Sequence, residues 1–385
     1  MPKSGSLRSE DASNGAILRC LPQDTLRWGV GVVDAVLGDL ADAGLERPMI
    51  FTVEPLLFST TRVILPQLHD VSGVHSDFPP HAPDTAIERA LDRCIRAGAR
   101  SIIAYGGGSV LDAAKAVSHF HWLRHGHHLP IVALPTTLSG SEFSHYFGVT
   151  ETSGVRPFKR SYAERATVPK IVLMDPSLLV HTPRALLLSS AIKGLDHAIE
   201  GMRQVDVDHP HAIMAAAGAN KFFDVLERWP SDLETDEAVQ RGAIRLDDLL
   251  QLQLAAWQCY FYPASVVYGL SHRIGHILGG TFGFPHSVTS CITLAPVIRS
   301  CEARYGSKLQ LFNAPGEANP GLALAARIER LVSCLGLPNR LRSFDIGLSA
   351  LPEIADLLRT NYKREVADLG EDADRKLDTL LRSVW

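Results

Sequence analysis

The stretch SIIAYGGGSVLDAAKAVSHFH, residues 101–121, runs from apolar residues through three glycines into a segment with helical spacing. A short apolar run bounded by glycine is typical of a buried strand, so we expect a strand over 101–105 and a helix over 110–121. Glycines at such a junction let backbone N–H groups approach a phosphate, and the helix N-terminus favours the anion. Because a triple glycine alone is more often a plain turn, the neighbouring segments have to support the phosphate interpretation.

The segments around this stretch also alternate between strand and helix patterns. Further strands are expected at 26–30, 48–53, 63–65, 71–74, 129–134 and 171–174, with material for a β-hairpin at 144–160. Helices are expected at 34–44 and 84–98. Strands interleaved with helices predict a mostly parallel sheet.

Beyond residue 183 the strand signals nearly vanish. Helical patterns instead cover 184–201, 211–226, 237–262, 271–278, 322–335 and 354–362. We therefore predict an α/β nucleotide-binding domain over 16–180 and an all-α domain carrying the catalytic residues over 181–385. Residues 1–15 are rich in serine, glycine and charge, and we expect them to form a disordered tail.

The composition describes an ordinary soluble protein of 385 residues, with 46% hydrophobic and 21% charged residues. A net charge of −4 gives no electrostatic reason to expect binding to nucleic acid or to an anionic membrane. Six scattered cysteines without a CxxC pair indicate reduced thiols, and no apolar run approaches the ~20 residues that span a bilayer. We expect a cytoplasmic protein whose partner is a small-molecule substrate.

Polar residues follow the predicted strands at the edge where ligands bind in parallel sheets. Asp112 lies on the first turns of the helix after the glycines, and Thr136 and Thr137 follow the next strand. Glu54 ends an earlier strand, where a carboxylate accepts hydrogen bonds from a ribose 2′-hydroxyl and repels a 2′-phosphate. A solvated carboxylate with no role is an equally good interpretation of Glu54, and the GxGxxG fingerprint is absent.

Two further segments, SSAIKGLDHAIEG at 189–201 and GLSHRIGHILGGTFGFPH at 269–286, concentrate ligand-type side chains. Residues four apart share one face of a helix, which pairs Lys193 with His197 and His272 with His276, and His286 follows a glycine-containing turn. Histidines and carboxylates bind Zn²⁺ or Fe²⁺, whereas a lysine with a reference pKa near ~10.4 is a cation that does not ligate one. A lone helical histidine is usually structural, but five such groups in two short segments favour a functional site. Asp196 is adjacent to His197 and is assigned to another helix face.

Several motifs in order resemble the iron-containing (group III) alcohol dehydrogenase family of the dehydroquinate synthase-like superfamily. They are GGGSVLDAAKA at 106–116, LPTTLSGSE at 134–142, DPSLLVHTP at 175–183 and the two histidine segments. The resemblance covers about residues 24 to 365. It implies a dehydroquinate synthase-like fold, in which a Rossmann-like α/β domain binds NAD(P), an all-α C-terminal domain follows, and a catalytic cleft lies between them. It also makes a homodimer plausible.

The resemblance implies roles for individual residues. The cofactor-binding set is Glu54, Gly106, Gly107, Gly108, Ser109, Asp112, Thr136, Thr137, Ser141 and Lys159. His197, His272 and His286 match three metal ligands of the family, and His276 matches a histidine beside the nicotinamide and substrate. Glu54 lies where the family often has an acidic residue, so NAD(H) is expected in preference to NADP(H).

The departure from the family pattern is Lys193, which stands where the family has its aspartate ligand. The contracted PTTLSGSE loop and Lys159-Arg160 resemble the maleylacetate reductase branch, which lacks the aspartate and works without metal. We therefore expect no metal and an NAD(P)H-dependent reduction of a carbonyl on a small, carboxylate-bearing substrate. Lys193, His197, His272 and His286 would stabilise the developing oxyanion, and one of them or His276 would donate the proton.

Two alternatives remain open from the sequence. The chain could be a non-redox lyase, cyclase or binding protein, with Lys193 forming a Schiff base to a carbonyl. It could also be a metal-dependent alcohol dehydrogenase that uses His197, His272 and His286 as its three ligands.

Overall fold

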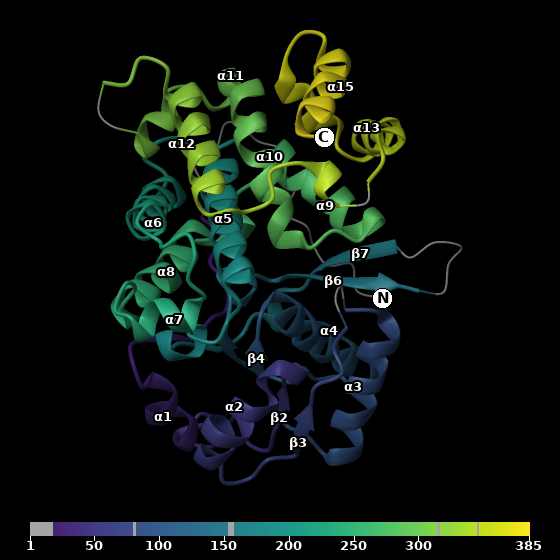
Figure 1. Ribbon diagram of the computed structural model, residues 1–385. Coiled ribbons are helices and arrows are strands. Elements are labelled where there is room, and N and C mark those ends of the chain that lie inside the picture. Colours follow the sequence, from purple (N-terminus) through teal and green to yellow (C-terminus); the bar gives the residue numbers. More distant parts are fainter. Residues whose placement is uncertain (1–17, 80–81, 153–157, 314–315, 345) are drawn as a thin grey trace.

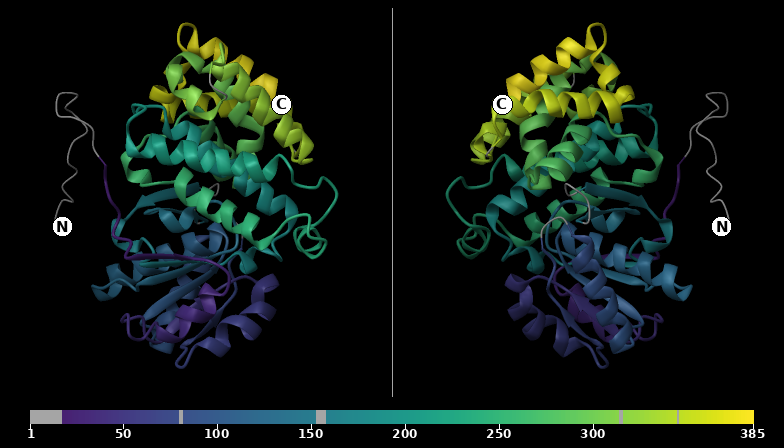
Figure 2. Two further views of the ribbon diagram at one scale, coloured as in Figure 1. Left: turned by 90° about the vertical axis from the view of Figure 1, so that its left-hand side faces the viewer. Right: turned by 90° about the vertical axis from the view of Figure 1, so that its right-hand side faces the viewer.

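The computed structural model describes residues 18–79, 82–152, 158–313, 316–344 and 346–385. The tail expected over 1–15 lies outside the described residues. Figure 1 and Figure 2 show the α/β part, in purple and blue, below a helical part in teal, green and yellow. Among the described residues no helix combines the length and the apolar character needed to cross a membrane.

A six-stranded parallel sheet forms the centre of the α/β part. Its strands lie in the order β1 (Thr25–Trp28), β8 (Ile171–Met174), β5 (Ile131–Pro135), β4 (Ser101–Gly106), β2 (Pro48–Phe51) and β3 (Gly73–His75). Along β4, Ile102 and Ala104 face one apolar cluster, while Ile103 and Tyr105 face another. The centre of the sheet is therefore buried on both faces, which explains why its four inner strands are continuous, mostly apolar runs rather than alternating ones.

Helices cover the two faces of this sheet. They are α1 (Val32–Val36), the short α2 (Leu57–Ser59), α3 (Asp84–Ala97) and α4 (Gly108–His125). The strand expected at 63–65 is wrong, because Thr60–Ile64 forms helical turns that continue α2. Thr60 and Ile64 are buried at i, i+4 spacing, which is the period of a helix.

An antiparallel hairpin stands between the sheet and the helical part (Figure 1). It consists of β6 (Tyr146–Glu151) and β7 (Phe158–Ala163) and confirms the hairpin expected at 144–160. β6 packs on α4, and β7 contacts α9 of the helical part. The hairpin therefore bridges the α/β part and the helical part of the molecule.

The helical part is built around α5 (Arg184–Gly201). The surrounding helices are α6 (Pro210–Leu226), α7 (Thr235–Gln240), α8 (Leu246–Cys259), α9 (Leu270–Phe282), α10 (His286–Ser300), α11 (Glu302–Tyr305), α12 (Pro320–Cys334), α13 (Leu351–Asn361), α14 (Lys363–Val366) and α15 (Ala373–Val384). Every residue of α5 from Leu187 to Gly201 is buried. Gly194 allows close approach of α6, since a Cβ there would lie 2.5 Å from Cε2 of Phe222.

Two hydrogen bonds tie α5 and the residues just before it to the loop after β5. The backbone N–H of Leu138 donates to Ser190 Oγ at 2.9 Å, and Thr182 Oγ1 donates to the carbonyl of Thr136 at 2.7 Å. These bonds place the loop that follows the central strand directly against the helix that carries Lys193.

Candidate active site

The triple glycine forms the turn between β4 and α4, as the sequence predicts. A Cβ on Gly106 would lie 2.7 Å from Cγ2 of Val110, and one on Gly107 would lie 2.9 Å from Cγ2 of Thr137. Side chains at these two positions would therefore clash with α4 and with the loop after β5. Gly107 caps α4, and Ser109 in its first turn is exposed, so the helix N-terminus is accessible to an anion.

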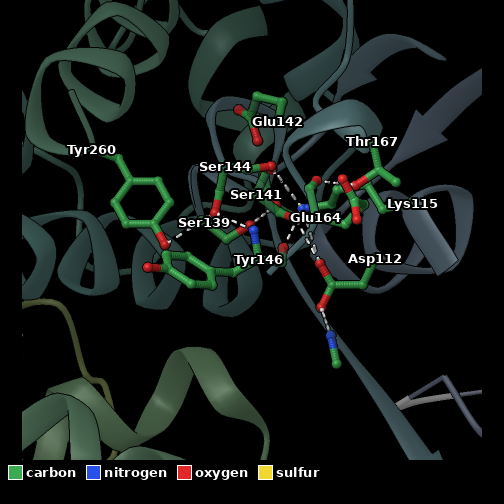
Figure 3. Close-up of polar contacts among 12 residues, drawn as sticks. Asp112, Lys115, Ser139, Ser141, Glu142, Ser144, Tyr146, Glu164, Thr167 and Tyr260 are labelled. Carbon is green, nitrogen blue, oxygen red and sulfur yellow. Dashed lines mark hydrogen bonds and ion pairs between the residues drawn. The ribbon is translucent and has the colours of Figure 1, made fainter. Parts of the chain in front are cut away.

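A buried lysine clamps the loop after β5 onto α4 (Figure 3). Lys115 Nζ donates to Ser141 Oγ at 2.8 Å and to the carbonyls of Ser141 and Tyr146 at 2.9 and 2.6 Å. Asp112 Oδ1 accepts from Ser141 Oγ at 2.6 Å, and Oδ2 accepts from the N–H of Gly148 at 3.3 Å. Asp112 and Ser141 thus bond other protein groups, and these bonds hold the loop after β5 against α4.

Of the remaining cofactor candidates, Thr136, Thr137 and Glu54 follow strands of the parallel sheet, whereas Lys159 lies in the hairpin. Thr136 and Thr137 are buried, and the N–H of Thr136 donates to the carbonyl of Gly106 at 3.1 Å. Glu54 is exposed and follows β2 at the start of a 3₁₀ turn. Lys159 pairs with Thr150 through its place in β7, while its side chain lies outside the described residues.

Lys193 points into a buried polar cluster rather than toward solvent. Its ammonium donates to Asp196 Oδ2 at 2.7 Å and lies 3.0 Å from His272 Nδ1. The exposed fractions of Lys193 and Asp196 are 1% and 0%, so this ion pair is shielded from water. Since the lysine donates to Nδ1, the neutral His272 ring carries its proton on Nε2.

The assignment of Asp196 to another helix face is therefore wrong. Residues three apart also lie side by side on a helix, and Asp196 stands three residues after Lys193. Burial alone would raise the pKa of Asp196, but the neighbouring ammonium lowers it below its ordinary value. The cluster is a lysine–carboxylate pair with a histidine, and the spacing of Lys193 and Asp196 was the sequence signal for it.

Two tyrosines hold the histidine rings in place. The His197 ring stacks on Tyr260 at 4.0 Å between centroids, and the His272 ring stacks on Tyr268 at 4.8 Å. Burial and the positive charge of Lys193 lower the pKa of both His197 and His272 well below the ordinary value. Both rings are therefore neutral near pH 7, which leaves the Lys193 ammonium as the cation of this cluster.

Tyr260 connects the two halves of the site. A Cβ at Gly140 would lie 3.0 Å from Cδ1 of Tyr260, and the Tyr260 ring also stacks on the His197 ring. The loop after β5 and the Lys193 cluster therefore meet across one aromatic side chain. Neither tyrosine was predicted as a site residue, because Tyr260 was only one position in the helix expected over 237–262 and Tyr268 lies between that helix and the one expected over 271–278.

Of the two remaining predicted histidines, His276 lies beside His272, whereas the structure describes only the backbone of His286. His276 is partly buried, and its ring lies 4.6 Å from the His272 ring and 6.5 Å from the Tyr362 ring. His286 is the first residue of α10, and its side chain lies outside the described residues. The structure thus brings together Lys193, His197, His272 and His276.

Comparison with known proteins agrees with this arrangement. A family model for iron-containing alcohol dehydrogenase matches residues 23–176, and a model for the C-terminal part of Fe-containing alcohol dehydrogenases matches 251–364. Maleylacetate reductase 1 of Cupriavidus pinatubonensis is 30% identical over 363 residues, which cover 93% of this chain and 94% of that protein. The chain belongs to the iron-containing alcohol dehydrogenase family. Membership makes it an NAD(P)-dependent oxidoreductase, as predicted, and its sequence is similar to that of maleylacetate reductases.

Solved structures of the family have the same fold. The crystal structure of maleylacetate reductase from Rhizobium sp. strain MTP-10005 has a TM-score of 0.78 and 22% identity, and covers 96% of this chain and 98% of that one. Sulfoacetaldehyde reductase from Bifidobacterium kashiwanohense in complex with NAD⁺ has a TM-score of 0.80 and 22% identity, with 96% and 99% covered. The predicted α/β-plus-helical fold class is confirmed.

Proposed function

We propose that this family member is a maleylacetate reductase-type enzyme. It uses NADH to reduce the carbonyl of a small, carboxylate-bearing substrate, and it does so without a catalytic metal. The observation that carries the proposal is the buried Lys193 ammonium, bonded to Asp196 and His272 on the two helices that carry the family's metal-site segments. The similarity to maleylacetate reductases over most of the chain supports the choice of substrate.

The Lys193 ammonium is suited to stabilise the oxygen of a carbonyl under reduction. Hydride addition to the carbonyl carbon puts negative charge on that oxygen. An ammonium has three N–H groups, of which Asp196 and His272 take two within the part of the chain that the structure describes. We propose that the third N–H donates to the substrate oxygen. We also propose that His276, the more exposed neighbour of His272, donates the proton that this oxygen takes up.

The turn after β4 and the loop after β5 are the proposed nucleotide site. Gly107 and Gly108 leave room at the N-terminus of α4, and Thr137 lies against Gly107. The bound nicotinamide supplies the hydride, while these residues hold and orient the nucleotide phosphates. Glu54, exposed just beyond β2, supports a preference for NAD(H) because its carboxylate repels a 2′-phosphate.

The side chains around Lys193 do not suit a divalent metal. Asp196 and His272, which have the chemistry of metal ligands, are already bonded to an ammonium. A divalent cation and an ammonium repel each other and cannot share the same two ligands. Across the described residues, moreover, no three His, Cys, Asp or Glu side chains are grouped to hold a metal. We derive no step through a metal.

The Schiff-base alternative is also disfavoured by these contacts. A lysine attacks a carbonyl only as the neutral amine, which needs a depressed pKa. The Asp196 carboxylate at 2.7 Å stabilises the protonated form instead. Trapping with borohydride separates the cases: a covalent adduct on Lys193 would contradict the proposal, while NADH oxidation with maleylacetate and no adduct would support it.

We also propose that the enzyme is a cytoplasmic homodimer. All six cysteines are free, which suits a reducing compartment. β1 lies at the edge of the sheet, and Trp28 at its end is 55% exposed, so this edge offers an apolar surface that a second copy of the chain could cover. Light scattering coupled to size exclusion tests the assembly: a mass of twice 41.9 kDa supports it, and a single chain mass contradicts it.

A further inference from the structure

We propose that Arg273 recognises a carboxylate of the substrate and so sets the preference of this enzyme for acidic substrates. The inference rests on the proposed function and deepens it, because it names the group that distinguishes a keto acid from a neutral aldehyde or ketone. The side chain stands next to His272 in sequence but was not among the residues that the motifs singled out.

Arg273 lies on the exposed side of α9, next to the proposed proton donor. Arg273 and His276 are three residues apart on the helix, and both are partly exposed, whereas His272, which precedes Arg273, is buried. The Arg273 guanidinium carbon is 5.2 Å from the centroid of the Tyr362 ring, which also neighbours His276. The positive charge is therefore held in one place beside the site of proton transfer.

The guanidinium keeps most of its donors available. Its Nε donates to Glu365 Oε1 at 2.9 Å, and its two terminal nitrogens have no hydrogen bond to any residue that the structure describes. Arg299 shows the contrast, because both of its terminal nitrogens bond Glu329 at 2.7 Å. Arg273 thus has a fixed orientation and a free pair of N–H groups, and such a planar pair matches the two oxygens of a carboxylate.

The positive charge of Arg273 acts on two tyrosines near α9, Tyr146 and Tyr362. Burial raises the pKa of Tyr146 at the start of β6, and the charges of Arg273 and Arg19 oppose that rise. Burial likewise raises the pKa of Tyr362, again opposed by Arg273. Glu365 is the carboxylate that faces the guanidinium from α14, and at 2.9 Å it offsets part of the charge. The part of the Arg273 charge that Glu365 does not offset would attract a substrate carboxylate bound between β6 and α9.

The test measures binding of a carboxylate that cannot be reduced. Maleate, with the uncharged maleamide as the comparison, is titrated by calorimetry into the NADH complex of the wild type, Arg273→Met and Arg273→Lys. We expect Arg273→Met to weaken maleate binding at least about tenfold, as loss of a charge-assisted pair does, and Arg273→Lys to weaken it less. Arg299→Met, which removes an exposed ion pair on α10, is the matched control and should bind maleate as the wild type does.

Folding is controlled separately, because Arg273→Met leaves Glu365 without its partner. Arg273→Met combined with Glu365→Gln removes that buried charge and should bind NADH normally while still binding maleate weakly. Maleate binding that survives Arg273→Met, or a wild type that binds maleate no better than the uncharged maleamide, would overturn the inference. Failure of the proposed function looks different, since it would appear as no NADH oxidation with maleylacetate whatever the binding result.

Discussion

Glu200 is a buried carboxyl group one turn beyond Asp196 on α5. It accepts a hydrogen bond from the N–H of His272 at 3.3 Å and another from the hydroxyl of Tyr305. Burial and the nearby Asp196 raise its pKa from the ordinary 4.5 to about 8. Glu200 is therefore protonated at neutral pH, which keeps a second negative charge away from the Lys193–Asp196 pair.

This residue makes the stability of the protein depend on pH. Between pH 4.5 and about 8 the folded chain keeps a proton that the unfolded chain releases, so this contribution is lost as pH rises. In the wild type, Glu200 should lower the free energy of unfolding by up to about 1.4 kcal/mol for each pH unit over that range. We expect the Glu200→Gln variant to lack this decrease. Urea unfolding of both proteins at pH 5, 6.5 and 8 measures it, and parallel pH profiles would show that Glu200 is ionised throughout.

Glu54 carries the expected choice of nucleotide. Its carboxylate is exposed, so replacing it should change the free energy of unfolding by less than about 0.5 kcal/mol. Glu54→Ser removes the repulsion of a 2′-phosphate, and we expect kcat/KM with NADPH to rise about tenfold relative to that with NADH. Steady-state assays of the wild type and of Glu54→Ser with both nucleotides measure this ratio of kcat/KM values. An unchanged ratio would assign the preference to other residues.

At the scale of elements, the packing of α5 against α6 depends on Gly194. A methyl group there would come within 2.5 Å of the Phe222 ring, and both helices are buried at this point. We expect Gly194→Ala to destabilise the protein by about 1–3 kcal/mol, as overpacked cores are destabilised. Gly38→Ala is the control, because the nearest atom to its added Cβ is 3.8 Å away. Equal melting curves for the two variants would refute close packing at Gly194.

The elements differ in how well the sequence predicted them. The bounds of α5 were correct because its apolar residues form one continuous pattern. The helix expected over 237–262 is instead α7 and α8, separated at Gly242, whose φ of 70° ends the first helix. α10 was not predicted, since Pro296 inside it interrupts the helical signal.

The candidate site was predictable only where spacing along one helix defines it. Lys193 and His197, and also His272 and His276, were found from their four-residue spacing. The three-residue spacing of Lys193 and Asp196 was overlooked, although the ion pair depends on it. Tyr260 and Tyr268 depend on how α8 and α9 pack against α5, which no local pattern encodes.

At the scale of the whole molecule, two parts with different architecture meet at the site. Figure 2 shows the sheet with its helices as one layer and the helical part as another, with the chain crossing between them near residue 180. We propose that this crossing is the boundary between the two domains. The contacts from Gly140 through Tyr260 to His197 give the loop after β5 and the Lys193 cluster fixed relative positions. Such fixed positions are what hydride transfer between two bound molecules requires.

The central claim is that the Lys193 ammonium, in place of a metal ion, stabilises the negative charge on the substrate oxygen during hydride transfer. The most direct measurement is NADH oxidation with maleylacetate after chelation, comparing the wild type with Lys193→Met and with Lys170→Met as a surface control. The account predicts full activity of the chelated wild type and of the control. It predicts at least a tenfold lower turnover for Lys193→Met, with NADH binding retained. A chelated wild type that regains activity only with Fe²⁺ or Zn²⁺, or a Lys193→Met variant with unchanged turnover, would contradict it.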